Sequence, residues 1–268
     1  QFIEHDCRHL EADSDSGNPY YICDLARKAG FKGIVFHYGL SMRYWSRMEG
    51  ELPIIVKING KTSIPPDDEA LSVHTSFVED AVRIGATAIG YTMYYGSPRQ
   101  DADLPQLAAV RRECERFGMP LIIWAYPRGR AIDAKGGRNS SYALESAARL
   151  AAEMGATIIK SNLPKDTPDL VKNDKVPEYY RQTEAELLEV NDKAERDYLR
   201  AKRIVEAAQG VPILFSGGGD KSEQDVLDNA RACVKAGCFG FIIGRNMWKR
   251  KMEDATRIAN VIEQALEE

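Results

Sequence analysis

Short apolar runs alternate along the chain with longer amphipathic segments. The runs are rich in β-branched residues and show little polar alternation, which is typical of parallel strands covered on both faces. Seven such runs lie at residues 33–37, 53–58, 86–91, 120–124, 156–160, 212–216 and 240–244. Apolar residues at three- and four-residue spacing predict helices between them, at residues 72–84, 104–117, 141–154, 194–208, 222–236 and 253–266.

This alternation predicts βα units and a parallel sheet. Eight strands would close a (β/α)₈ TIM barrel, so we expect the first strand to lie largely upstream of residue 1, with residues 2–5 in the loop that follows it. An open doubly wound sheet is the alternative, but no G-x-G-x-x-G fingerprint follows the first visible run. We predict one domain over residues 1–268.

A polar insertion at about 161–192 interrupts the rhythm and is longer than an ordinary βα loop. It predicts a short helix near residues 177–184, over the active-site end of the barrel. The segment is interpreted either as a lid or subunit contact or as a solvated surface insertion.

Composition narrows the class of protein. The 268 residues carry a net charge of −4 with 44 % apolar residues, so a basic nucleic-acid-binding surface is not expected. No apolar run approaches the length of a membrane span, and we recognise no signal peptide. Five cysteines without CxxC spacing argue against a disulfide framework or zinc site. We therefore expect a cytoplasmic protein without membrane or nucleic-acid partners.

Two strand ends carry residues able to perform carbon–carbon bond chemistry. Lys160 ends the fifth visible run, where lost hydration favours the neutral amine that forms Schiff bases. Tyr126 lies just beyond the preceding run and supplies a proton donor and acceptor. Trp124 is two residues earlier and faces the same side. The alternative for Lys160 is a structural lysine paired with a carboxylate. The alternative for Tyr126 and Trp124 is that both are aromatic core residues.

Further candidates surround this pair. Lys57 also lies in a strand and competes as nucleophile, or supports Lys160 as a second cation. It is also expected among the residues that bind the substrate or its phosphate. Arg128 is placed to bind phosphate or carboxylate as a fork. Glycine-rich loops after the last two runs match the usual phosphate site of barrels. The residues expected there are Ser216, Gly217, Gly218, Gly244 and Arg245.

The four histidines show no metal-binding spacing, and the carboxylates show no clear metal pattern. We therefore predict a reaction that uses no metal and no other cofactor. The glycine loops predict a phosphorylated substrate. A non-catalytic sugar-phosphate sensor would keep the glycine loops without needing Lys160 or Tyr126. An isomerase barrel would need a carboxylate base at a strand end, and no visible strand ends in an obvious glutamate.

These segments, taken together over nearly the whole chain, resemble the archaeal-type class I fructose-1,6-bisphosphate aldolases. The motifs are Trp-Ala-Tyr-Pro-Arg-Gly at 124–129, Ile-Ile-Lys at 158–160, Ser-Gly-Gly at 216–218 and Gly-Arg-Asn-Met-Trp at 244–248. The resemblance implies metal-free, reversible cleavage of fructose 1,6-bisphosphate into dihydroxyacetone phosphate and glyceraldehyde 3-phosphate. It also implies a homo-oligomer, often a decamer.

The resemblance assigns roles to individual residues. It implies that Lys160 forms the Schiff base, Tyr126 donates the proton, and the two glycine loops with Arg245 hold phosphate. A related synthase of an aromatic-amino-acid precursor shares the lysine and tyrosine, but Trp124 favours the bisphosphate aldolase. The family aspartate at the end of the first strand would precede Gln1.

Overall fold

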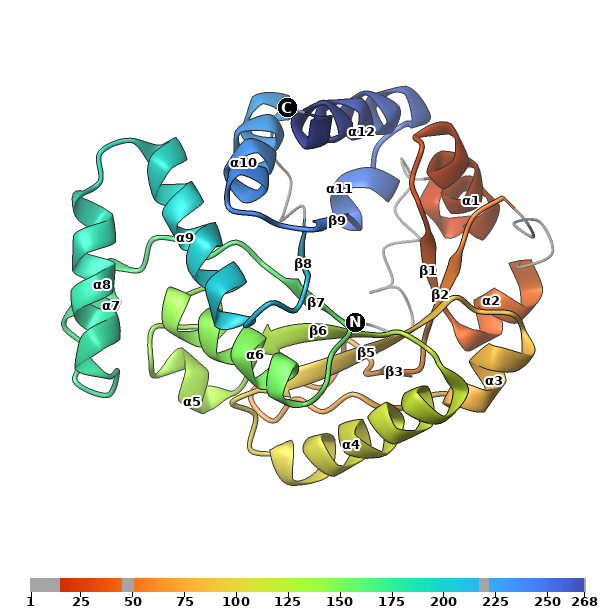
Figure 1. Ribbon diagram of the computed structural model, residues 1–268, viewed down its shortest axis with the longest axis horizontal. Coiled ribbons are helices and arrows are strands. Elements are labelled where there is room, and N and C mark those ends of the chain that lie inside the picture. The colour runs from red at the N-terminus through yellow and green to blue at the C-terminus, as the bar shows by residue number, and fades with distance from the viewer. Residues whose placement is uncertain (1–14, 45–50, 217–221, 268) are drawn as a thin grey trace.

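The structure is a computed structural model that describes residues 15–44, 51–216 and 222–267. Seven parallel strands form one curled sheet, with helices around its outside (Figure 1). Within this sheet, the strands lie side by side in the order in which they occur along the chain. The strands are β1 (Ile34–His37), β2 (Ile54–Lys57), β5 (Ala88–Tyr95), β6 (Leu121–Pro127), β7 (Ile158–Ser161), β8 (Ile213–Ser216) and β9 (Gly240–Ile242).

This strand order confirms the barrel-type fold over the doubly wound alternative. A doubly wound sheet reverses its strand order at a switch point, and no reversal occurs here. All seven apolar runs form the predicted strands. The strand expected upstream of residue 1 lies outside the described residues.

Helices follow the strands and pack on the outer face of the sheet. Five of the six predicted helices are present with ends close to those expected; Gly118, for example, ends α4 at a φ of 66°. The helices of the first half are α1 (Pro19–Lys28), which precedes β1, α2 (Tyr38–Tyr44), α3 (Val78–Arg83), α4 (Gln100–Phe117), α5 (Arg130–Asp133) and α6 (Ser141–Glu153). Those of the second half are α7 (Pro168–Val171), α8 (Glu178–Glu189), α9 (Lys193–Ala207), α10 (Glu223–Lys235), α11 (Arg245–Trp248) and α12 (Met252–Glu267), and a 3-10 turn (Asp15–Gly17) precedes α1.

The helix predicted over residues 72–84 was wrong in its first half. Val73–His74 forms strand β4, which pairs antiparallel with β3 (Asn59–Gly60). Helix α3 starts only at Val78, because the Asp80 carboxylate accepts a hydrogen bond from the Phe77 N–H at 2.9 Å and caps the helix there. The β3–β4 excursion therefore places the loop of residues 61–72 beside the barrel.

The sheet separates two apolar layers. The outward strand residues pack under the helices, and the inward ones form a smaller cluster that includes Tyr94, Trp124 and Tyr126. Side chains alternate between the two faces along each strand, and residues paired in register on neighbouring strands point to the same face. Trp124 pairs with Lys160, and Lys57 pairs with Gly90, so all four positions face the barrel interior.

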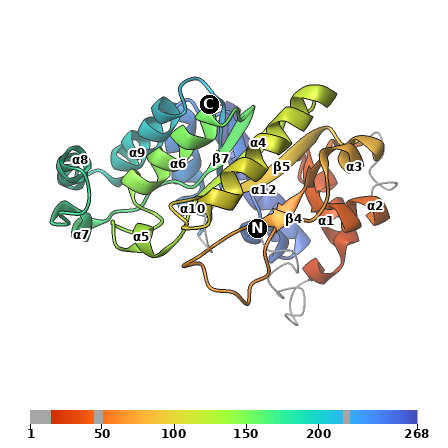
Figure 2. The same cartoon turned by 90° about the horizontal axis from the view of Figure 1, so that it is seen from below.

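The insertion at 161–192 contains the predicted helix, which extends further as α8. This helix contacts α6 and α9, so the segment lies beside the barrel, and the position expected over the active-site end was wrong. In Figures 1 and 2, α7 and α8 lie at the end of the molecule opposite α1 and α2. No helix of the described residues is long and apolar enough to cross a membrane.

Candidate active site

Lys160 and Tyr126 meet inside the barrel. The Lys160 Nζ donates a hydrogen bond to the Tyr126 hydroxyl at 2.6 Å. Their strands are neighbours, and Tyr126 lies two residues beyond the Trp124–Lys160 pair, so the lysine side chain reaches up the barrel to the phenol. Lys160 is half-buried and Tyr126 is buried. An amine and a proton-carrying hydroxyl are therefore in direct contact, as the strand-end positions predicted.

Trp124 lies between the two lysines of the barrel. Its ring centroid is 5.2 Å from the Lys57 Nζ and 5.9 Å from the Lys160 Nζ, within the range of cation–π attraction. The indole also lies against Gly90, where a Cβ atom would come within 2.8 Å of a ring carbon. Gly90 thus leaves the space that the ring fills.

Lys57 is buried deeper than Lys160 and has neutral partners. Its Nζ donates to the carbonyl and the side-chain oxygen of Asn59 at 3.0 and 2.9 Å. Burial, and then the positive charge of Lys160, hold the pKa of Lys57 well below its ordinary value, while Asp103 opposes this shift. The site therefore disfavours the protonated form of Lys57 beside the second amine.

A buried polar network supports these residues and was not predicted from the sequence. The Asn59 side-chain oxygen also accepts from the Thr92 N–H at 2.7 Å. The Asp103 carboxylate accepts from the Tyr91 hydroxyl at 2.6 Å and the Tyr94 N–H at 2.9 Å. Asn59 could have been found from the sequence, because it lies two residues after Lys57 and alternation along a strand places both on the same face. Asp103 lies in helix α4, and no sequence pattern connects it with the strand residues.

His37 is a second missed residue. It ends β1 and pairs in register with Lys57, so it faces the same side of the sheet. Burial, followed by the charge of Lys57, lowers the pKa of His37 to about 3. The mouth therefore contains a neutral imidazole that the search for metal-binding spacing did not single out.

The ends of β8 and β9, which the two predicted phosphate loops follow, are adjacent, since Ser216 pairs in register with Ile242. Ser216 donates a hydrogen bond to the Asn162 side chain. Gly244 precedes α11, and a side chain there would collide with the Trp248 ring at 2.8 Å. Gly217, Gly218 and the side chain of Arg245 lie outside the described residues.

Arg128 follows β6 at the rim of the barrel. Its guanidinium carbon is 5.3 Å from the Tyr126 ring centroid, and its Nε is 3.0 Å from an Asp67 oxygen. Asp67 is also 2.7 Å from Lys61 and 3.5 Å from Arg138. Burial alone would raise the pKa of Asp67, but these three cations outweigh it and hold the pKa below its ordinary value.

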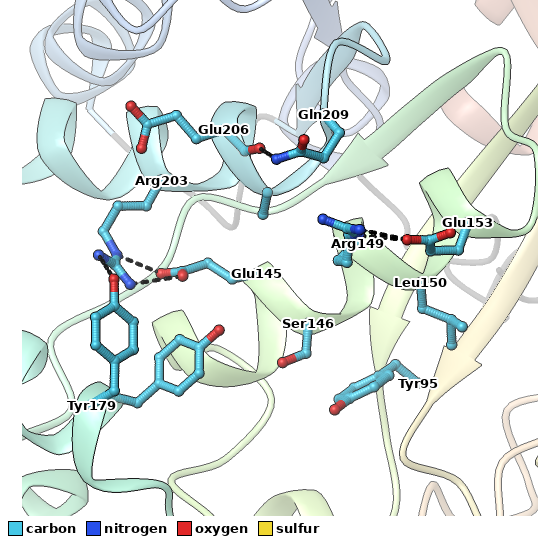
Figure 3. Close-up of a pocket in the computed structure, with 12 residues that line it drawn as sticks. Tyr95, Glu145, Ser146, Arg149, Leu150, Glu153, Tyr179, Arg203, Glu206 and Gln209 are labelled. Carbon is cyan, nitrogen blue, oxygen red and sulfur yellow. Dashed lines mark hydrogen bonds and ion pairs between the residues drawn. The ribbon is translucent and has the colours of Figure 1, made fainter.

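A surface groove of about 580 Å³ lies outside the barrel, between α6, α8 and α9 (Figure 3). Its arginines are already paired, Arg203 with Glu145 at 2.7 Å and Arg149 with Glu153 at 2.6 Å. The groove contains neither Lys160 nor Tyr126, so we place the chemistry in the barrel. Among the described residues, no three His, Cys, Asp or Glu side chains gather where they could hold a metal ion.

Comparison with known proteins agrees with this geometry. The family described as "DeoC/LacD family aldolase" matches residues 4–250. The chain belongs to the DeoC/LacD aldolase family. A class 1 fructose-bisphosphate aldolase of Thermoproteus tenax is 34 % identical over 262 residues, which cover 97 % of this chain and 84 % of the relative. A Halobacterium salinarum protein of the same name is 23 % identical, over 93 % of this chain and 81 % of the relative.

Solved structures of this aldolase family support the same fold. An archaeal fructose-1,6-bisphosphate aldolase, solved with its catalytic lysine covalently bound to the carbinolamine intermediate, is 31 % identical with a TM-score of 0.75, over 98 % of this chain and 88 % of that one. An aldolase from Slackia heliotrinireducens shares the fold at 19 % identity, with a TM-score of 0.78 over 99 % and 77 % of the two chains. The resemblance read from the motifs is confirmed.

Proposed function

We propose that this DeoC/LacD family member is a class I fructose-bisphosphate aldolase, a lyase in which Lys160 forms the Schiff base. It cleaves fructose 1,6-bisphosphate reversibly into dihydroxyacetone phosphate and glyceraldehyde 3-phosphate without a metal. The observation that carries the proposal is the contact of 2.6 Å between the Lys160 Nζ and the Tyr126 hydroxyl inside the barrel. The names of the Thermoproteus and Halobacterium relatives support the same substrate.

The first half of the mechanism uses Lys160. Its neutral amine adds to the ketone carbonyl, and loss of water gives an iminium. The neighbouring carbon–carbon bond then breaks, and its electron pair moves to the iminium nitrogen to give an enamine. The hydroxyl carbon on the leaving side becomes the aldehyde and releases its proton.

The second half uses Tyr126 as the proton carrier. Its hydroxyl lies beside the reacting amine, so it gives its proton to the water that leaves as the iminium forms. The phenolate then takes the proton released on cleavage and passes it to the enamine carbon, and hydrolysis of the imine returns a proton to it. The imine that results is hydrolysed by water, which frees Lys160 and the ketone product. Trp124 covers the lysines and limits the access of water to the imine until the aldehyde has formed.

Lys57 supports the nucleophile. Its burial and its contact with Asn59 favour an electrostatic role over the phosphate contact also expected for it. Its amine lies 5.2 Å from the centroid of the Trp124 ring that also faces Lys160, so it contributes to the electrostatic environment of the nucleophile.

The phosphates orient the sugar. The loops with Ser216, Gly217, Gly218, Gly244 and Arg245 hold one phosphate, as barrel loops after the last strands commonly do. Arg128, at the rim near Tyr126, takes a phosphate on the other side. Binding energy from these remote groups holds the ketone carbon against Lys160.

We further propose that the enzyme works in the cytoplasm, in glycolysis and gluconeogenesis, as a homo-oligomer and by family resemblance a decamer. Exposed apolar side chains support assembly, among them Ile64, Phe77 and Phe239. The measured mass of the particle in solution tests this part, and a monomer contradicts it.

A direct assay tests the activity. The purified protein is given fructose 1,6-bisphosphate, and release of glyceraldehyde 3-phosphate is followed with a coupled dehydrogenase. We expect turnover that Tyr126→Phe lowers by about 100-fold or more. Binding of the sugar without cleavage would instead favour the sensor, and equal rates for both proteins would exclude Tyr126 as the proton carrier.

A further inference from the structure

Asn162 is a polar side chain at the mouth of the barrel that the proposed mechanism does not use. It comes two residues after Lys160, immediately beyond the last residue of β7. Its side-chain oxygen accepts a hydrogen bond from the Ser216 hydroxyl. Ser216 faces the interior, because it lies two residues after Leu214, the register partner of Lys160. The Asn162 side chain therefore lies on the same inner face as the reacting amine.

The register places Asn162 at the level where the chemistry is proposed to occur. Trp124 pairs with Lys160 across β6 and β7. The residues two positions further along, Tyr126 and Asn162, are therefore level with each other. The Lys160 side chain reaches up to this level, since its Nζ is 2.6 Å from the Tyr126 hydroxyl. The reacting amine thus ends at the level of the Asn162 carboxamide.

The two polar atoms of this carboxamide are used differently. The oxygen is held by Ser216, which restrains rotation of the group. Among the described residues, nothing accepts a hydrogen bond from the nitrogen Nδ2. Asn162 is only half-buried, and Nδ2 is not one of the buried polar atoms without a partner, so solvent reaches it from the mouth. Two amide N–H donors are therefore available beside the nucleophile.

Addition of an amine to a ketone creates charge that such donors stabilise. The electron pair of the Lys160 Nζ forms the carbon–nitrogen bond, and the carbonyl π pair moves onto the oxygen. A proton then passes from the nitrogen to this oxygen to give the carbinolamine. The same oxygen leaves as water when Tyr126 gives it a second proton. Asparagine side chains stabilise oxygens on which negative charge develops in this way.

The geometry favours the ketone oxygen over the phosphate as the acceptor. That oxygen is one bond away from the carbon that joins Nζ, and Nζ ends at the Asn162 level. A carbonyl oxygen has two lone pairs, so it accepts from the Tyr126 hydroxyl on one side and from Nδ2 on the other. The proposed phosphate loop begins only after Ser216, on the far side of the carboxamide.

We propose that Asn162 is a catalytic residue whose Nδ2 donates a hydrogen bond to the ketone oxygen while Lys160 adds to the carbonyl carbon. The inference rests on the proposed aldolase function and adds a second donor to the Tyr126 hydroxyl. Asn162 stabilises the developing charge and transfers no proton. Ser216 holds the carboxamide oxygen, so that the nitrogen is left for the substrate.

The test measures formation of the covalent adduct. The full chain and its variants are mixed with dihydroxyacetone phosphate and quenched with borohydride over a range of times and concentrations. Asn162→Ala removes the whole carboxamide, whereas Asn162→Asp keeps an oxygen that accepts from Ser216 and removes only the N–H donors. Asn173→Ala is the matched control, because this half-buried asparagine of the insertion donates to the Ala134 carbonyl at 2.9 Å.

We expect both Asn162 variants to lower the maximal rate of adduct formation by about 100-fold, the effect of losing one such donor. The half-saturating concentration should change by less than about threefold, because the contact strengthens only as the charge develops. The loss in Asn162→Asp should persist at pH 9, since a carboxylate that only retained a proton on a neighbouring amine would lose its effect as the pH rises. Asn173→Ala should react like the unmodified protein.

Several results would overturn the inference. An unchanged maximal rate, with or without a higher half-saturating concentration, would make Asn162 at most a binding contact. A normal rate in Asn162→Asp beside a slow Asn162→Ala, or recovery of Asn162→Asp at pH 9, would leave it without a donor role. Melting temperatures are measured for all variants, and Asn162→Asp decides if Asn162→Ala alone is unstable.

Failure of the proposed function gives a different result. An unmodified protein that forms no adduct and cleaves no fructose 1,6-bisphosphate would reject the aldolase assignment, and the role of Asn162 with it. An unmodified protein that forms the adduct, beside Asn162 variants that form it equally fast, would keep the assignment and reject only the role of Asn162.

Discussion

Two regions of the molecule bury positive charge, and they neutralise it differently. In the barrel, Lys57 is 2 % exposed and its hydrogen bonds go to the neutral groups of Asn59. Beside the insertion, Arg200 is completely buried but donates two hydrogen bonds of 2.8 Å to the Glu184 carboxylate. Asp166 adds a second carboxylate at 3.2 Å from Arg200.

We interpret the paired charge of Arg200 as structural and the unpaired amines of the barrel as groups that serve the proposed chemistry. The Arg200–Glu184 pair is balanced, and it fixes α8 to α9. The Lys57–Lys160 pair brings two amines together with no carboxylate in hydrogen-bond contact with either among the described residues. Such an arrangement costs stability, and it holds the pKa of Lys57 below its ordinary value.

The largest effect is expected at the nucleophile. Lys160→Ala should lower turnover of fructose 1,6-bisphosphate by about 10⁴-fold or more, because no imine can form, while the far-UV spectrum and melting temperature stay near those of the unmodified protein. Lys165→Ala, at an exposed lysine just beyond β7, is the control. Turnover close to normal in Lys160→Ala would contradict the assignment.

Breaking the balanced pair should act on stability. Glu184→Ala leaves the Arg200 guanidinium buried without its main partner, so the free energy of unfolding should fall by about 3–5 kcal/mol. Denaturant titration measures this loss. Glu186→Ala, at an exposed position of the same helix, should change stability by less than about 0.5 kcal/mol. Equal effects of the two variants would contradict the role of the pair.

Removing the unbalanced amine should act in the opposite direction. The lowered pKa of Lys57 means that the unfolded chain binds its proton more tightly, so this lysine costs stability at neutral pH, and the cost shrinks as the pH rises toward the ordinary lysine pKa. Lys57→Met should therefore keep or raise the melting temperature at pH 7, with less gain at pH 10, yet lower kcat by about tenfold or more. A large loss of stability at pH 7 would contradict this account.

A smaller effect is expected where Trp124 packs. An added methyl group at Gly90 would lie 2.8 Å from the indole, so Gly90→Ala should displace the ring and lower kcat several-fold. Tryptophan fluorescence should report the displacement. Gly39→Ala, at a glycine with no atoms within 4 Å of an added Cβ, is the matched control. An unchanged spectrum and rate in Gly90→Ala would show that the packing has no functional role.

No effect is expected from metal removal. The amine and the hydroxyl supply both the electron sink and the proton transfer, so EDTA should leave turnover unchanged. The assay is repeated after dialysis against the chelator. Activity that disappears and returns with zinc would point to a metal-dependent aldolase.

Local patterns were enough to predict the strands and the contact between Lys160 and Tyr126. Lys160 and Tyr126 each lie at the end of an apolar run, and consecutive parallel strands place such ends together. The supporting contacts were not predictable in this way, because they join distant segments. Arg128 and Asp67 are 61 residues apart, and no repeat or spacing connects them. The start of α3 was also missed, because pairing of Val73 with Gly60 competes with helix formation.

The central claim is that Lys160 forms a covalent imine with the sugar. The most direct measurement is reduction with borohydride in the presence of fructose 1,6-bisphosphate or dihydroxyacetone phosphate, followed by peptide mass mapping. We predict a stable adduct on the peptide that contains Lys160, and none in Lys160→Ala. An adduct on Lys57 would move the nucleophile to the other amine, and no adduct from a protein that turns over the sugar would contradict Schiff-base chemistry.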